Sequence, residues 1–191
     1  MCFVGNHSDS FTSAPSVCSV YSVGNNSISM TAPLRIARVT LSDRASAGIY
    51  ADLSGPEIER ILTPAFPPIT PAFLSRLIPD DRATISSTLI ALADTDHCDL
   101  IVTTGGTGPA PRDVTPEATR DVLDRELPGF GEIMRILSFP AVPTAILSRA
   151  TAGTRGRTLI INLPGNPRAI GECLPPLLPA IRECLKHLQG G

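Results

Sequence analysis

The chain has no tryptophan, few aromatic residues and no long apolar run. Of its 191 residues, 42% are hydrophobic and 4% aromatic. No apolar stretch approaches the roughly 20 residues that a membrane-spanning helix needs, so we predict no membrane association. The formal net charge is only −2 at pH 7. This near balance argues against a surface built to bind nucleic acid.

The cysteines lack the spacing of the common metal and disulfide motifs. They stand at positions 2, 18, 98, 173 and 184, and no two of them form a C-x-x-C pair. This pattern argues against a zinc cluster and against a disulfide framework. We therefore expect reduced, mostly buried thiols in a cytoplasmic protein.

Basic residues are missing from the beginning of the chain. Residues 1–33 are rich in Ser and Asn, and the first Lys or Arg is Arg35. Signal and transit peptides normally carry positive charge near their start. We interpret residues 1–33 as a disordered leader, with translation from Met30 as a related hypothesis. Residues 34–190 are then expected to form one domain.

Strand-like and helix-like segments alternate from residue 34 onward. Apolar and β-branched runs predict strands over residues 34–41, 73–78, 100–103, 144–147 and 158–162. Apolar periodicity and capping residues predict five helices: residues 54–62, a helix capped by Asp80 or Asp81 that ends near residue 93, a helix capped by Thr115, residues 131–138, and residues 166–188 with a break at Pro175-Pro176. This order predicts a mainly parallel α/β sheet with helices on both sides.

A glycine loop follows the third predicted strand, with the sequence Thr103-Thr104-Gly105-Gly106-Thr107-Gly108. Glycine permits positive φ and lets a ligand approach the backbone closely. Successive N–H groups in such a turn can bind phosphate. The loop lacks the ending of a P-loop and the spacing of a dinucleotide fingerprint. A tight turn that only reverses the chain is the alternative.

Two aspartates are expected beside this loop. Asp113 lies five residues after Gly108 and next to Arg112, and Asp80 follows the second predicted strand. Ligands of parallel α/β sheets bind at the carboxyl ends of the strands, so both carboxylates should lie at one edge. Together they could hold one Mg²⁺ against bound phosphates. The alternatives are a helix cap at Asp80 and a plain loop carboxylate at Asp113.

Further polar loops are expected at the same edge. They are Ser42-Asp43, Ser148-Arg149 and residues 162–167, each after a predicted strand. Simple turns are the alternative for each loop taken alone. The three histidines stand away from the expected edge, and no nucleophile with a neighbouring base is apparent. Direct in-line phosphoryl chemistry is therefore favoured over a covalent intermediate.

Together these motifs resemble those of the molybdopterin adenylyltransferase family. The matching segments are residues 42–48, 78–80, 103–108, 112–118 and 162–167, in the order found in the family. The resemblance extends over residues 34 to about 190. It implies a three-layer α/β/α fold, a homotrimer, and transfer of AMP from ATP to the terminal phosphate of molybdopterin with release of pyrophosphate.

The resemblance also implies roles for individual residues. Asp80 and Asp113 match the family's catalytic, Mg²⁺-binding carboxylates, and Ser148 and Asn162 match positions that contact the pterin. The residues expected to bind substrate are Ser42, Asp43, Thr104, Gly105, Gly106, Thr107, Gly108, Ser148, Asn162 and Gly165. The implied partners are molybdopterin, ATP and a molybdenum-insertion enzyme that receives the product. A MoaB-like pterin-binding scaffold without transferase activity is the alternative function.

Overall fold

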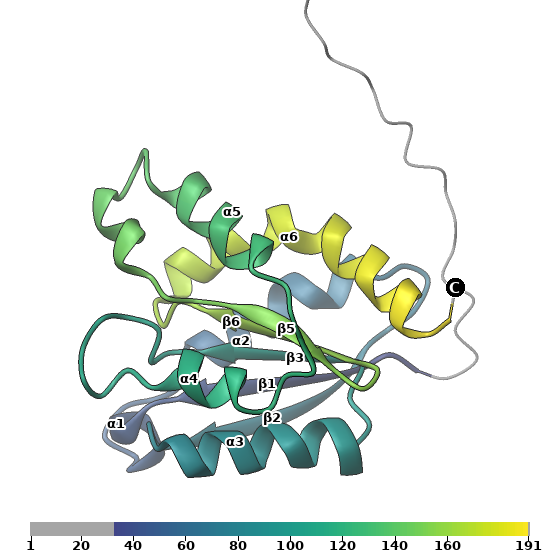
Figure 1. The fold of residues 1–191 in the computed structure, drawn as a ribbon, viewed down its shortest axis with the longest axis horizontal. Coiled ribbons are helices and arrows are strands. Elements are labelled where there is room, and N and C mark those ends of the chain that lie inside the picture. The colour runs from purple at the N-terminus through teal and green to yellow at the C-terminus, as the bar shows by residue number, and fades with distance from the viewer. Residues whose placement is uncertain (1–32, 191) are drawn as a thin grey trace, which may run out of the picture.

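A six-stranded sheet lies between two layers of helices in the computed structural model, which describes residues 33–190 (Figure 1). The strand order is β2-β1-β3-β6-β5-β4. The predicted three-layer α/β/α fold with a mainly parallel sheet is confirmed. Residues 1–32 of the predicted leader lie outside the described part of the chain. Within residues 33–190, no helix has the length and apolar character needed to cross a bilayer.

Four neighbouring parallel strands form the larger part of the sheet. They are β1 (Arg35–Leu41), β2 (Ala72–Ile78), β3 (Leu100–Thr104) and β6 (Thr158–Leu163), and they match the predicted strands to within one residue at each end. Every residue of β3 and β6 is buried. Strands covered by helices on both faces read as continuous apolar runs, which is why these strands were readable from the sequence.

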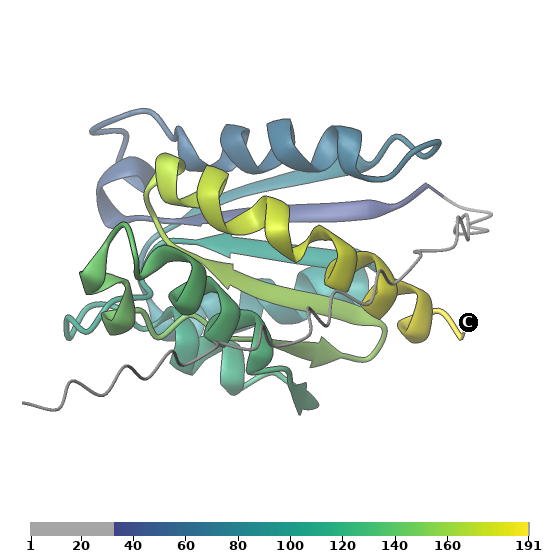
Figure 2. The same cartoon turned by 90° about the horizontal axis from the view of Figure 1, so that it is seen from above.

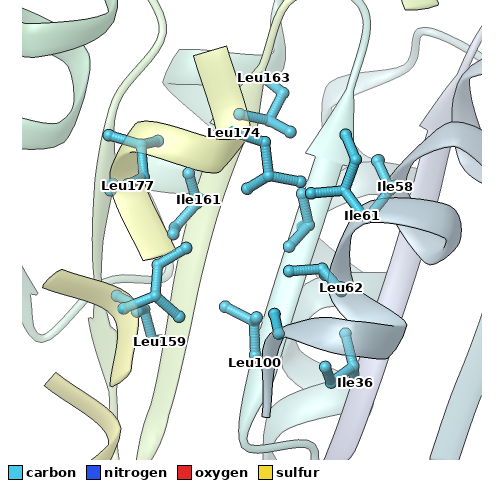
Figure 3. Close-up of a cluster of buried hydrophobic side chains, with 14 of the residues drawn as sticks. Ile36, Ile58, Ile61, Leu62, Leu100, Leu159, Ile161, Leu163, Leu174 and Leu177 are labelled. Carbon is cyan, nitrogen blue, oxygen red and sulfur yellow. The ribbon is translucent and has the colours of Figure 1, made fainter. Parts of the chain in front are cut away.

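Helices cover both faces of the sheet. The face built by Ile36, Leu100 and Ile161 packs against α2 (Ser54–Leu62), α5 (Gly129–Ser138) and α6 (Pro167–Leu188) (Figures 2 and 3). The opposite face packs against α3 (Arg82–Ile90), the π-helical turn η2 (Ala91–Thr95) and α4 (Thr115–Arg120). Short turns complete the chain, namely α1 (Asp43–Ser46), η1 (Thr63–Ala65) and η3 (Pro143–Leu147).

The predicted strand over residues 144–147 is wrong. These residues belong to the 3₁₀ helix η3, and Ile146 and Leu147 are exposed. Pro143 starts this turn, and its fixed φ and missing N–H suit the first position of a helix. The strand in this region is instead β5 (Ala152–Arg155), which runs antiparallel to β6 and pairs with the short β4 (Arg125–Glu126).

Two details of the predicted helices are also wrong. Helix α6 continues through Pro175-Pro176 without a break. One stripe of its side chains, including Leu174 and Leu177, is buried against the sheet, and this packing offsets the hydrogen bonds that proline removes. Thr115 is the first residue of α4 rather than its cap, because its hydroxyl is hydrogen-bonded to the glycine loop instead.

Candidate active site

The loops at one edge of the sheet come from the carboxyl ends of the parallel strands, where ligands of such folds bind. Ser148-Arg149 also lies at this edge, but not for the predicted reason. Because β5 runs opposite to β6, it begins at the edge where the parallel strands end. The backbone N–H of Arg149 donates to the carbonyl of Thr107 at 2.8 Å. The segment that leads into β5 therefore contacts the glycine loop directly.

The glycines of the loop are required by their conformation and surroundings. Gly105 and Gly106 have φ values of +104° and +61°. A Cβ added to Gly105 would lie 2.3 Å from the carbonyl oxygen of Leu41, and one added to Gly106 would lie 2.4 Å from Oγ1 of Thr115. Any side chain would therefore displace the loop from the end of β1 or from α4.

The loop carbonyls face inward, which turns the following N–H groups outward. Thr115 donates from Oγ1 to Gly105 at 2.9 Å and from its backbone N–H to Gly106 at 3.2 Å. Arg149 holds the carbonyl of Thr107, as described above. A trans peptide points its C=O and the next N–H in opposite directions. The N–H groups that point outward are those of Gly106, Thr107 and Gly108. None of them has an acceptor within residues 33–190.

Asp80 lies beside this row of N–H groups. Its Oδ2 accepts from the backbone N–H of Asp43 at 3.0 Å, and its own N–H donates to Oδ1 of Asp43 at 3.0 Å. Arg112 in turn donates from Nε and Nη2 to the Asp43 carboxylate at 2.8 Å. A Cβ built on Gly106 would lie 3.0 Å from Oδ1 of Asp80. One carboxylate oxygen thus borders the loop, and Asp81 rather than Asp80 caps α3.

Asp113 borders the other end of the glycine loop. Its Oδ2 accepts from the backbone N–H of Ala110 at 3.0 Å, and a Cβ built on Gly108 would lie 2.8 Å from the same oxygen. The charge of Asp113 also contributes to raising the pKa of Asp80. The two predicted catalytic carboxylates therefore lie on either side of the outward N–H groups.

The electrostatics at Asp80 suit a cation. The pKa of this carboxyl is raised, mainly by burial and further by the charges of Asp43 and Asp113. The hydrogen bond from the Asp43 N–H and the charge of Arg112 lower it in part. Within residues 33–190, no three Asp, Glu, His or Cys side chains cluster as a complete metal site. Mg²⁺ commonly binds one or two carboxylates together with substrate phosphates. Asp80 and Asp113 fit that arrangement.

The raised pKa predicts that Asp80 opposes folding at neutral pH. An acid whose folded-state pKa is raised favours the folded state only below the ordinary aspartate range, about pH 4. At pH 7 the free energy of unfolding of Asp80→Asn should therefore equal or exceed that of the wild type. Any gain in this free energy should shrink toward pH 4, and urea titrations at several pH values measure it. The matched control is Asp81→Asn, because hydrogen bonds from Thr84 lower the pKa of Asp81. A loss of stability at pH 7 in both variants would contradict this assignment.

Two cavities open beside the loop. The smaller, of about 240 Å³, is lined by Ser42, Thr104, Gly105 and Gly165 among others. The larger, of about 510 Å³, lies between α5, η3 and the beginning of α6, and its lining includes Ser148, Arg135 and Arg168.

Two further predicted site residues form hydrogen bonds within the protein. Ser42 caps α1, and its hydroxyl is hydrogen-bonded to the hydroxyl of Tyr50 at 2.7 Å. The carbonyl of Gly165 accepts from Ser54 Oγ at 2.8 Å.

Two of the predicted substrate-binding residues are fully buried, and their side chains form hydrogen bonds to neighbouring segments. Thr104 is fully buried, and its Oγ1 donates to the carbonyl of Pro164 at 2.8 Å. Asn162 is also fully buried, and its Nδ2 donates to Oγ1 of Thr103 at 3.0 Å and of Thr119 at 2.9 Å. Thr104 thus joins the start of the glycine loop to the loop after β6, and Asn162 joins β6 to β3 and α4.

Asp52 is a site residue that the sequence reasoning missed. It lines the smaller cavity. Its Oδ1 accepts from the N–H groups of Ser54 and Gly55, both at 3.0 Å, and its Oδ2 accepts from Thr40 Oγ1 at 2.8 Å and from Arg38 Nη1 at 3.1 Å. The signal was present, since an Asp just before a predicted helix is a capping residue. Arg38, in the middle of the first predicted strand, also needed an acidic partner.

Comparisons with known proteins point to one family. A family model described as a probable molybdopterin-binding domain matches residues 37–183. The molybdopterin adenylyltransferase of Escherichia coli K12 is 56% identical over 155 residues, which cover 81% of this chain and 78% of the relative. The enzyme of the same name from Helicobacter pylori 26695 is 51% identical over 158 residues, which cover 82% of this chain and 89% of the relative.

A solved structure shows the same fold. The molybdopterin biosynthesis enzyme MoaB from Thermus thermophilus superimposes with a TM-score of 0.75 at 44% sequence identity, over 83% of this chain and 98% of the other. The family model, the curated relatives and the solved structure all match the segment that carries the glycine loop, Asp80 and Asp113. The chain belongs to the molybdopterin adenylyltransferase family.

Proposed function

We propose that this protein transfers AMP from ATP to the terminal phosphate of molybdopterin and releases pyrophosphate, a late step in molybdenum cofactor biosynthesis. The observation that carries the proposal is the row of three outward N–H groups in the glycine loop, bordered by Asp80 and Asp113. Relatives at 50–56% identity are molybdopterin adenylyltransferases, which supports the same reaction here.

The glycine loop provides the electrostatic part of catalysis. When the molybdopterin phosphate attacks the α-phosphorus of ATP in line, negative charge develops on the equatorial oxygens of that phosphorus. N–H groups that are already oriented stabilise this charge without reorganising, and removal of one such donor commonly costs about 10²-fold to 10³-fold in rate. Asp80 and Asp113 would hold a Mg²⁺ ion, which neutralises charge on the phosphates and so makes pyrophosphate a better leaving group.

The larger cavity is the proposed position of the pterin. Ser148 lines it, together with Arg135 and Arg168 near the beginning of α6. The N–H groups at the start of that helix and the two guanidinium groups favour a phosphorylated ligand. Pro164, which lines this cavity, lies close to the glycine loop, since a Cβ built on the neighbouring Gly165 would lie 3.3 Å from the Cα of Gly105. Both substrates can therefore meet at this edge.

A pyrophosphate-release assay tests the proposed reaction. The enzyme should release pyrophosphate from MgATP only when molybdopterin is present, and adenylyl-molybdopterin should accumulate. A MoaB-like scaffold would bind molybdopterin without releasing pyrophosphate. The molybdopterin adenylyltransferase of Escherichia coli K12 is 56% identical over 78% of its own length, and this likeness favours the enzyme. We further propose that the reaction occurs in the cytoplasm and that the product passes to a molybdenum-insertion enzyme.

An apolar surface on α5, η3 and the residues between them supports the proposed homotrimer. The exposed large apolar side chains of this surface are Ile133, Ile136, Leu137, Phe139, Val142, Ile146 and Leu147. Contiguous apolar surfaces of this kind commonly mark interfaces between proteins. Ile136→Lys should therefore lower the mass measured by light scattering to that of a monomer. The control is Ile90→Lys, on the other side of the sheet, and equal masses for the two variants would contradict this interface.

A further inference from the structure

Arg149 contacts both the end of the glycine loop and the segment that follows it. Its backbone N–H holds the carbonyl of Thr107, and its Nε donates to the carbonyl of Gly108 at 2.8 Å. Its Nη2 donates to the carbonyl of Asp113. A single residue just before β5 therefore joins the end of the glycine loop to the backbone of one catalytic carboxylate.

These contacts fix groups that face the proposed phosphate site. With the carbonyl of Thr107 held by Arg149, the N–H of Gly108 points outward, where it has no acceptor within residues 33–190. With the carbonyl of Asp113 also held, that residue cannot move away from Gly108, whose built Cβ lies 2.8 Å from the Asp113 carboxylate. The backbone N–H of Arg149 remains in any variant, so it is the guanidinium, bonded to the carbonyls of Gly108 and Asp113, that sets the spacing between a phosphate donor and a carboxylate.

The orientation of the guanidinium is itself fixed by Glu117. Nη1 of Arg149 forms an ion pair with Oε1 of Glu117 on α4, and both side chains are about one third exposed. Oε2 of Glu117 is buried and has no hydrogen-bond partner in the described part of the chain. Because its charge is paired with Glu117 and its donors are directed at loop carbonyls, Arg149 is suited to hold the loop rather than to bind phosphate.

We propose that Arg149 is a positioning residue for AMP transfer, which acts by holding the glycine loop and Asp113 in register for the triphosphate. The inference rests on the proposed function. The competing interpretation is a plain structural ion pair, which would contribute little to stability and would have no role in turnover. Misplacement of reacting groups by about 1 Å can instead cost about 10²-fold in rate. The two interpretations therefore predict different kinetics.

The test compares Arg149→Met with Arg155→Met. Arg155, at the far end of β5, is a matched control, because it pairs with Asp94 and donates to the carbonyl of Val122 at 3.0 Å. We expect Arg149→Met to lower kcat about 10²-fold in the pyrophosphate-release assay. It should also weaken the binding of inorganic tripolyphosphate with Mg²⁺, measured by calorimetry. Arg155→Met should leave both properties close to those of the wild type.

If Arg149→Met fails to fold, Arg149→Lys still separates the effect of the positive charge from the effect of the hydrogen bonds to the loop. Lysine can keep the ion pair with Glu117, but it cannot direct fixed donors at several carbonyls. It should retain the melting temperature and lose turnover. Full turnover in Arg149→Lys, equal losses in the Met variants of Arg149 and Arg155, or no tripolyphosphate binding by the wild type would each overturn the inference. If the wild type binds tripolyphosphate but releases no pyrophosphate, the proposed function is refuted. The tripolyphosphate affinities of the wild type and of Arg149→Met would then still decide whether Arg149 holds the loop.

Discussion

Replacement of Asp113 by alanine is expected to slow AMP transfer by about 10²-fold or more, with a smaller effect on the KM for ATP. Asp113 lies at the end of the glycine loop, where its carboxylate accepts from Ala110 and would lie 2.8 Å from a Cβ built on Gly108. Its negative charge is the feature that would hold Mg²⁺ against the phosphates. Initial rates of pyrophosphate release over a range of MgATP concentrations would give kcat and KM separately.

The charge of Asp113 can be separated from its role in the loop. Asp113→Asn keeps an oxygen that can accept from Ala110, so the loop should retain its shape, yet turnover should fall about as far as in the alanine variant. Asp121→Ala is the control, because Asp121 is an exposed carboxylate paired with Arg82. Near-normal turnover of Asp113→Ala with MgATP would refute the assigned role.

Gly106→Ala is expected to reduce turnover by about 10²-fold as well, through the position of the loop. The alanine methyl group would lie 2.4 Å from Oγ1 of Thr115 and 3.0 Å from Oδ1 of Asp80. Relief of these contacts requires movement of the N–H groups that face the phosphates. Triphosphate binding should weaken together with kcat, because both depend on the same N–H groups. Calorimetry with tripolyphosphate and the kinetic assay together measure the two effects.

Gly156 supplies the control for this variant. It has φ +53°, close to the +61° of Gly106, but a Cβ built there meets nothing within 4 Å. The left-handed backbone should cost alanine about 1 kcal/mol of stability at either position, and at Gly106 the close contact with Thr115 adds to that cost. Only Gly106→Ala should lose turnover. Equal kinetic losses in the two variants would show that general destabilisation, rather than the loop, explains the effect.

The central part of the fold could be predicted because its strands have distinctive sequences. β3 and β6 are short, largely apolar and buried on both faces, and each is followed by a loop with a recognisable motif. β4 and β5 lie at the end of the sheet and carry no such pattern. The apolar residues of η3 resemble a strand, but their side chains form an exposed surface. Pattern alone cannot distinguish these two cases.

The candidate site could be located from the sequence, but the directions of its side chains could not. The positions of Asp80, Asp113 and the glycine loop after strands are enough to bring them to one edge. Whether a residue at the end of a strand faces the ligand or the core depends on alternation and packing. Asn162 and Thr104 are polar residues in this region, yet both are buried, and their side chains form hydrogen bonds to neighbouring segments. Likewise, only the antiparallel direction of β5 reveals what Arg149 contacts.

A crystal structure with Mg²⁺ and an ATP analogue that has a methylene group between the α- and β-phosphorus atoms would test the central claim most directly. We expect the phosphates to accept from the N–H groups of Gly106, Thr107 and Gly108, with the metal bound by Asp80 and Asp113. Phosphates bound elsewhere, or a metal that contacts neither aspartate, would contradict the catalytic roles assigned to these residues.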